Sequence, residues 1–227
     1  MDRPVDASLQ TLAMTEPTAM PHFSILLGGA LTPTVRLRAQ TAGSRVIAAD
    51  GGMAHAAALG LVAELWVGDF DSASPALQAR YRTVPRETHP ADKDKSDGEI
   101  AVDAAIARGA AELILAGALG GQTDHALGNL ALMLALARRG VRCFASSGDE
   151  EAHPLLPGRM QLDLPVGSRV SIIALADLGG LDFKGVRWPL DQALISAGST
   201  RTLSNVVTGG IEIGLRSGTG LVLAYPM

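Results

Sequence analysis

The stretch ELWVGDFDS, residues 64–72, joins a short apolar strand to a glycine and then to two aspartates at alternate positions. In an extended segment side chains alternate between faces, so Asp69 and Asp71 should project to the same side, about 7 Å apart. Carboxylates this close repel one another unless a cation lies between them, and Mg²⁺ binds through one or two carboxylates plus substrate phosphates. The alternative is a capping turn, with Asp71 or Ser72 as N-cap of a helix that Pro75 would open. This stretch alone leaves both interpretations open.

Around this stretch, apolar strands alternate with helical segments, which is the pattern of a parallel sheet with crossover helices. Ligands of such sheets bind at the carboxyl ends of the strands, where the glycine and aspartate clusters of this sequence fall. The predicted strands are 23–27, 45–49, 64–67, 81–84, 112–118 and 141–146, and the predicted helices are 33–40, 53–59, 98–107 and 126–139.

The remaining residues, 148–227, carry short β-type runs and no long helical period. Turn pairs such as Gly179-Gly180, Gly209-Gly210 and Ser217-Gly218 separate the runs. The predicted fold class is therefore α/β: an N-terminal parallel-sheet nucleotide-binding domain over 22–147, followed by a C-terminal all-β sandwich or flattened barrel over 148–227. Residues 1–21 are predicted to be a flexible leader, and one of its internal methionines could be the true start.

Composition narrows the function classes. The chain has 227 residues, 47% of them hydrophobic, which suits one or two domains with a sizeable core. A net charge of -4 gives no broad basic surface for nucleic acid. The single Cys143 cannot form an internal disulfide, and no apolar run approaches the ~20 residues that a membrane span needs. We therefore expect a cytoplasmic protein without nucleic-acid or membrane partners.

Two glycine-rich loops follow predicted strands and precede predicted helices. Asp50-Gly51-Gly52 could let a phosphate or a ribose approach backbone amides, or could simply be a tight turn with a helix cap. The loop over 117–121 is similar. Neither loop has the GxGxxG or GxxxxGK[ST] pattern, which argues against a dinucleotide site and against a Walker-type ATPase.

The most charged run is HPADKDKSDGE, residues 89–99. It is not an EF-hand loop, because Asp97 occupies the sixth position, where glycine is required. Either Ser96 or Asp97 caps the next helix from a solvated loop, or Asp97 joins the metal ligands while Lys93 or Lys95 binds a phosphate.

Trp188, one of two tryptophans, lies beside a predicted turn. It is either a core residue or a surface residue whose ring face attracts a cationic aromatic ring.

The motifs, taken in order, resemble those of bacterial thiamine pyrophosphokinases over about residues 23 to 225. They are ADGG (49–52), VGDFDS (67–72), DKDKSDGEIAV (92–102), GALGGQTDHALGN (117–129), GVRWPL (185–190) and LSN (203–205). The resemblance implies a homodimer with a thiamine site between the subunits. It also implies Mg²⁺-dependent transfer of diphosphate from ATP, the co-substrate, to the hydroxyl of thiamine, which gives thiamine diphosphate and AMP.

The resemblance also implies roles for individual residues. Asp69, Asp71 and Asp97 would bind Mg²⁺ and the phosphates, and either Asp71 or Asp97 would accept the hydroxyl proton. Many relatives have an arginine at the position of Gln122, so this chain lacks one cation there. The nucleotide side is assigned to Asp50, Gly51, Lys93, Ser96, Gln122 and Asp124, and the thiamine side to Trp188, Ser204 and Asn205.

Two rival functions remain at this stage. A pyrophosphokinase acting on another alcohol, such as a hydroxymethyl-pterin, could use the same first domain. A non-catalytic sensor of nucleotide or thiamine could keep the fold and bind without releasing AMP. The GVRWPL and LSN motifs favour thiamine over the first rival, and the retained acidic positions argue against the second.

Overall fold

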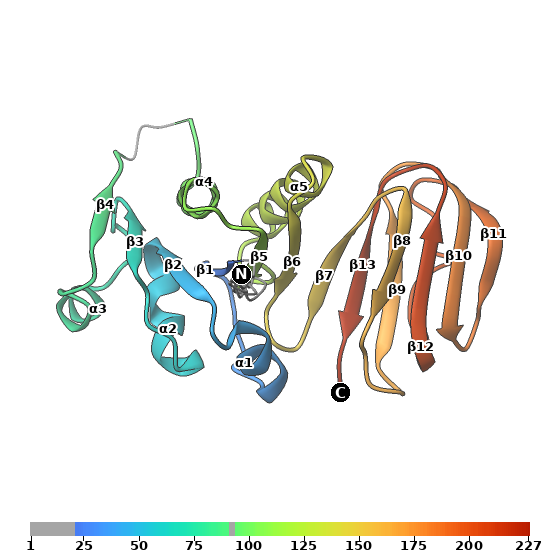
Figure 1. Cartoon of the computed structure of the whole chain (residues 1–227), viewed down its shortest axis with the longest axis horizontal. Helices are drawn as coiled ribbons and strands as arrows, with labels where there is room; N and C mark the ends of the chain where they lie inside the picture. The colour runs from blue at the N-terminus through green and yellow to red at the C-terminus, as the bar shows by residue number, and fades with distance from the viewer. Residues whose placement is uncertain (1–20, 91–93) are drawn as a thin grey trace, which may run out of the picture.

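The structure, a computed structural model, describes residues 21–90 and 94–227 (Figure 1). Six strands at one end of the molecule pair in parallel, in the order β6-β5-β1-β2-β3-β4. This arrangement confirms the predicted parallel sheet. The strands are β1 (His22–Leu26), β2 (Arg45–Ala49), β3 (Leu65–Gly68), β4 (Arg86–Thr88), β5 (Glu112–Ala116) and β6 (Arg142–Ser146).

Helices cover both faces of this parallel part (Figure 1). Phe23 and Ile25 pack in the core under α4 and α5, whereas Leu26 belongs to the opposite core with α1 and α2. Both faces are buried, so the strands are almost continuously apolar rather than alternating. The helices are α1 (Val35–Thr41), α2 (Ala54–Leu59), α3 (Pro75–Arg80), α4 (Asp97–Ala107) and α5 (Thr123–Arg138), and a short 3₁₀ turn, η1 (Asp50–Met53), precedes α2.

Seven further strands continue the hydrogen-bonded sheet from β6, so the fold is a mixed α/β arrangement around one large sheet. The strand order over the described residues is β11-β10-β12-β9-β13-β7-β6 and onward, and β8 pairs with β12. The chain crosses into this part through the antiparallel pairing of β6 with β7. The strands are β7 (Glu151–Leu155), β8 (Gly158–Leu162), β9 (Arg169–Ala174), β10 (Leu178–Val186), β11 (Leu190–Ile195), β12 (Asn205–Leu215) and β13 (Gly220–Tyr225).

Several local predictions were wrong. The strand expected over 81–84 begins at Arg86, because Tyr81 still ends α3 as its C-cap. The N-cap of α3 is Ser74, whose side chain accepts from the Leu77 amide, and not Asp71 or Ser72. Gly179-Gly180 and Gly209-Gly210 lie inside β10 and β12 rather than at turns.

The predicted leader, 1–21, lies outside the described residues except for Pro21. No helix within residues 21–90 or 94–227 is long and apolar enough to cross a membrane.

Cys143 on β6 is a half-buried free thiol, and burial raises its pKa to about 12. It therefore stays protonated at neutral pH.

A buried ion pair joins α1 to β7. The side chain of Glu151 is 1% exposed and accepts hydrogen bonds from Arg36 Nε at 2.5 Å and from Gln40 Nε2 at 2.7 Å. Burial by itself would raise the pKa of Glu151, but hydrogen bonds from His153, Arg36 and Gln40 outweigh it and hold the pKa at about 2. The parallel part of the sheet is thereby attached to the antiparallel part through a charged group.

Replacing Glu151 with Gln should lower the free energy of unfolding by about 2 kcal/mol at pH 7. The folded-state pKa lies below the ordinary value of 4.5, so the contribution is complete above pH 4.5 and is lost as the pH falls toward 2. Denaturant unfolding at pH 7 and at pH 3 should show the wild type and E151Q converging at the lower pH. The control is E112Q, in the exposed pair with Arg142. A difference between wild type and E151Q that does not depend on pH would contradict this account.

Candidate functional site

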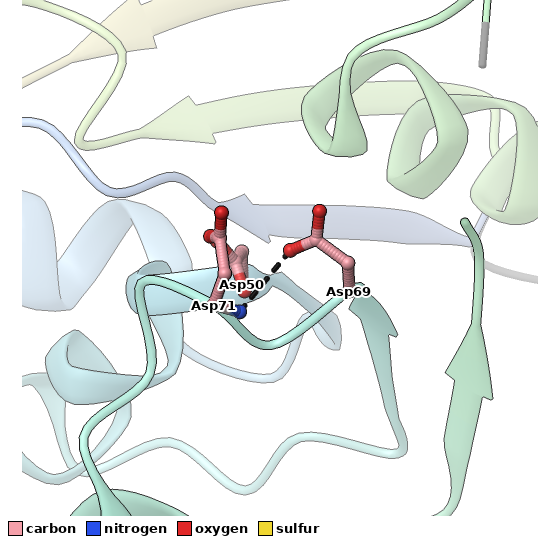
Figure 2. A group of neighbouring side chains, drawn as sticks. All are labelled: Asp50, Asp69 and Asp71. Carbon is pink, nitrogen blue, oxygen red and sulfur yellow. Dashed lines mark hydrogen bonds between the residues drawn. The ribbon is translucent and has the colours of Figure 1, made fainter. Parts of the chain in front are cut away.

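Three carboxylates converge where β2 and β3 end. Asp50, Asp69 and Asp71 each offer an oxygen, and these oxygens lie within 4.8 Å of one another (Figure 2). Asp50 follows β2 directly, and Asp69 follows β3. Since β2 and β3 are parallel neighbours in the sheet, their carboxyl ends place these side chains together.

The sequence suggested that strand alternation brings Asp69 and Asp71 to the same side. In the structure the backbone bends between them instead. β3 ends at Gly68, and Phe70 between the aspartates has a left-handed φ of 65°. The Asp71 amide donates to Asp69 Oδ1 at 3.1 Å (Figure 2). Trp66 packs edge-on against the Phe70 ring, and the Arg86 guanidinium lies over both rings. These contacts hold a backbone conformation that is costly for phenylalanine.

Asp50 is held in a second strained conformation, with a φ of 45°. Its carbonyl accepts from Trp66 Nε1 at 2.8 Å, and its Oδ2 accepts from the Ser72 hydroxyl. Its other oxygen, Oδ1, is buried and has no hydrogen-bond partner among the described residues. Burial raises the pKa of Asp50; the Ser72 hydrogen bond opposes this, and the charges of Asp97, Asp69 and Asp71 add to it.

Asp97 faces the same cluster from the start of α4. A Cβ placed on Gly68 would lie 3.3 Å from both Asp50 Oδ1 and Asp97 Oδ1, so these two oxygens border one space. Asp97 is not among the three residues whose oxygens lie within 4.8 Å of one another. The geometry therefore groups Asp50 with Asp69 and Asp71, and places the predicted ligand Asp97 beside them.

This donor set fits a hard divalent cation. Carboxylate oxygens are the ligands that Mg²⁺ takes in proteins, and an unpaired buried oxygen such as Asp50 Oδ1 is costly without a partner. A cation would offset the repulsion among the carboxylates and would supply the missing partner of Asp50.

Among the other residues predicted for the nucleotide side, some lie in the described part of the structure and one does not. Lys93 lies outside the described residues. Ser96 is the N-cap of α4 and accepts from the Glu99 amide at 3.2 Å, as the capping interpretation expected. Lys95, the alternative to Lys93, pairs with Asp103 and Glu99 along the same helix. The Lys95 ammonium group therefore already has two carboxylate partners.

Gln122 and Asp124 are exposed at the start of α5. Gln122 is the N-cap but makes no side-chain capping bond, and Asp124 Oδ1 accepts from the His125 amide at 2.9 Å.

The β2 loop lies close to β1, because a side chain at Gly52 would meet the Leu26 carbonyl oxygen at 2.2 Å. The loops after β1, β2 and β5 thus pack against one another at the carboxyl edge, and His55 Nε2 lies 2.9 Å from the Gly29 carbonyl oxygen there.

The predicted thiamine residues form a separate group. Trp188 is 56% exposed, so it is not a core residue, unlike Trp66. The Trp188 amide donates to Asn205 Oδ1 at 3.1 Å, and Asn205 Nδ2 donates to the Trp188 carbonyl at 2.8 Å. Both residues line a cavity of about 280 Å³ with Arg201 and Thr202. Ser204, with a φ of 58°, precedes Asn205 but is not among the lining residues.

The Trp188 ring already has a cation near its face. The Arg187 guanidinium carbon lies 5.5 Å from the ring centroid. This contact is an example of the attraction between an indole face and a positive group.

The acidic cluster follows β2 and β3, and the Trp188 cavity lies at β10, β11 and β12, which are in the opposite half of the molecule (Figure 1). Six strands separate β2 from β12 in the sheet order. Seven spacings of about 4.8 Å therefore separate the two strands, a path of about 34 Å measured along the sheet.

Comparisons with known proteins identify the family. The model described as "Thiamin pyrophosphokinase, catalytic domain" matches residues 38–145, and the model described as "Thiamin pyrophosphokinase, vitamin B1 binding domain" matches residues 159–220. The chain belongs to the thiamine pyrophosphokinase family. The first model covers the acidic cluster, and the second covers the Trp188 cavity.

Similar proteins agree with this assignment. The thiamine pyrophosphokinase of Bacillus subtilis (strain 168) is 28% identical over 142 residues, which span 61% of this chain and 66% of that relative, just under two thirds of its length. A crystal structure of the Bacillus subtilis thiamine pyrophosphokinase has a TM-score of 0.80 at 22% identity and covers 90% of this chain and 99% of that chain. The Geobacillus thermodenitrificans thiamin pyrophosphokinase has a TM-score of 0.77 at 26% identity, with 90% and 97% covered.

Replacing Asp71 with Asn should raise the melting temperature in EDTA by about 2–4 °C, because one of three mutually repelling charges is removed. The same variant should lose most of the stabilisation that excess MgCl₂ gives the wild type. Thermal unfolding with EDTA and with MgCl₂ measures both effects. D149N is the control, since Asp149 is exposed and lies outside the cluster. A D71N protein that gains as much stability from Mg²⁺ as the wild type would contradict the proposed cation site.

Proposed function

We propose that this protein transfers diphosphate from ATP to the hydroxyl of thiamine, giving thiamine diphosphate and AMP. The observation that carries the proposal is the convergence of Asp50, Asp69 and Asp71, with Asp97 beside them, at the carboxyl edge of a parallel sheet. Family membership supplies the substrate pair, and the acidic cluster supplies a place for a cation and a triphosphate.

Mg²⁺ is the proposed cation, held by Asp50, Asp69 and Asp71. When bound, the ion would neutralise charge on the triphosphate, as in other phosphoryl transfers. The chain's own residues fix the loops that carry these carboxylates: the Asp69 carboxylate binds the Asp71 amide, and Trp66 binds the Asp50 carbonyl. The ligands therefore need little rearrangement when the cation binds.

In the proposed reaction, the thiamine hydroxyl oxygen attacks the β-phosphorus of ATP. The bond from that phosphorus to the oxygen bridging the α-phosphate breaks, and AMP leaves. The hydroxyl proton goes to a carboxylate, either Asp71 or Asp97. Gln122 cannot supply the positive charge that an arginine would give at this position. Lys93 remains a proposed phosphate contact.

The separation of the two groups supports a homodimer in which each active site is shared. We place the boundary between the functional parts at residues 147 and 148, with an ATP-binding part over 22–147 and a thiamine-binding β-sandwich over 148–227. A sandwich is supported by the core in which side chains of β9 and β13 pack against those of β10 and β12. The Trp188, Ser204 and Asn205 group of one subunit would face the acidic cluster of the other. A cytoplasmic location stays a prediction from the sequence.

The wild-type protein, incubated with ATP, MgCl₂ and thiamine, should release AMP and thiamine diphosphate in equal amounts. Nucleotide chromatography and mass analysis of the thiamine product measure both. ADP as the product would indicate a simple phosphate kinase and would overturn the proposal. Binding of thiamine without AMP release would favour the sensor, and faster turnover with a hydroxymethyl-pterin would favour the other pyrophosphokinase.

The shared site predicts complementation between two defective variants. W188A should raise the KM for thiamine about tenfold, through loss of the cation–π contact, and D71N should be inactive. When the two variants are unfolded together and refolded, half of the dimers should be mixed, and one site in each should be intact. Activity at low thiamine concentration should then return to about a quarter of that of the wild type. Mixed samples no more active than the sum of the separate variants would contradict a shared site, and an unchanged KM in W188A would favour a different alcohol.

A further inference from the structure

The Ser72 hydroxyl connects the two loops that carry the acidic cluster. It donates to Asp50 Oδ2 and accepts from the Gly51 amide at 2.9 Å. The direction of each bond is fixed, because an ionised carboxylate only accepts and an amide N–H only donates. Ser72 thus bridges the β2 loop to the β3 loop.

Ser72 also determines which oxygen of Asp50 remains available. With Oδ2 bound to the hydroxyl, Oδ1 is the atom without a hydrogen-bond partner among the described residues. This oxygen borders the space above Gly68 that Asp97 Oδ1 also borders. Without the hydroxyl, the carboxylate of Asp50 could rotate about its Cβ–Cγ bond, and neither oxygen would be held toward this space.

The local backbone is built to let this hydroxyl approach. A Cβ on Gly51 would lie 2.8 Å from Ser72 Oγ, so any larger residue there would push the hydroxyl away. Asp50 itself has a φ of 45°, a conformation that must be stabilised by its surroundings. Both features favour a specific role for the Ser72 contact over a chance surface hydrogen bond.

We propose that Ser72 is a positioning residue that orients Asp50 so that Oδ1 faces the divalent cation. It acts through Asp50 and touches neither ATP nor thiamine. This inference rests on the proposed function for its cation. Hydrogen bonds to ligating carboxylates typically change metal affinity by about 10–100-fold when they are removed.

The test is a Mg²⁺ titration of the melting temperature, which does not depend on catalysis. S72A and S72C should require about tenfold more Mg²⁺ for half of the full stabilisation, whereas S72T, which keeps a hydroxyl, should stay within a few-fold of the wild type. S72C keeps a polar side chain at this position but replaces the hydroxyl with a larger group that is only a weak donor. In the AMP assay, S72A should regain activity at high Mg²⁺, with the KM for thiamine unchanged.

The matched control is S74A, in the same loop. Ser74 caps α3 by accepting from the Leu77 amide and does not contact Asp50. S74A should lower the melting temperature and leave the half-saturating Mg²⁺ concentration unchanged. Wild-type Mg²⁺ dependence in S72A and S72C would overturn the role of Ser72 and leave the proposed function intact. A wild type that Mg²⁺ stabilises but that releases no AMP would overturn the proposed function and leave the role of Ser72 intact.

Discussion

The parallel pairing of β2 with β3 is the constraint on which the site depends. Ala49 is paired with Val67, so the chain leaves both strands at nearly the same level of the sheet, and Asp50 and Asp69 follow within two residues. Carboxylates brought together in this way repel one another, and the left-handed backbone conformations of Asp50 and Phe70 add a further cost. Packing of Trp66, Phe70 and Arg86 beneath the loop opposes that strain. A site that is costly in the free protein is suited to bind a cation tightly.

The apolar runs were enough to predict the parallel sheet, because strands buried on both faces have few polar residues. β7 and β8 lack such apolar runs, since β7 includes His153 and Pro154 and β8 is largely exposed. Glycine pairs inside β10 and β12 resembled turns because glycine is usual in both turns and irregular strands. β6 and β7 form a local hairpin, in which Ser146 pairs with Glu151 across the short turn 147–150, and the predicted domain boundary falls inside that turn.

The sequence predicted several of the residues that gather at the site, but not the backbone geometry that brings them together. The sequence indicated that Asp69 and Asp71 meet, yet the cause is the left-handed Phe70 and not strand alternation. Asp50 was assigned to the nucleotide from the resemblance, whereas the structure groups its carboxylate with those of Asp69 and Asp71 and leaves its Oδ1 without a hydrogen-bond partner among the described residues. The Ser72 bridge could not be read from the sequence, because it joins residues from two loops whose approach depends on the sheet. Trp188 and Asn205 were expected on the same side of the site, and two hydrogen bonds join them.

The central claim is that Asp50, Asp69 and Asp71 hold one divalent cation, and diffraction from crystals grown with MnCl₂ and a non-hydrolysable ATP analogue tests it most directly. Mn²⁺ takes the same oxygen ligands as Mg²⁺, and its anomalous signal locates it without ambiguity. The account predicts a peak at coordination distance from Asp50 Oδ1 and from an oxygen of Asp69 or Asp71, in contact with the triphosphate. A triphosphate bound at the edge of the sheet whose only manganese lies away from these three carboxylates would contradict it.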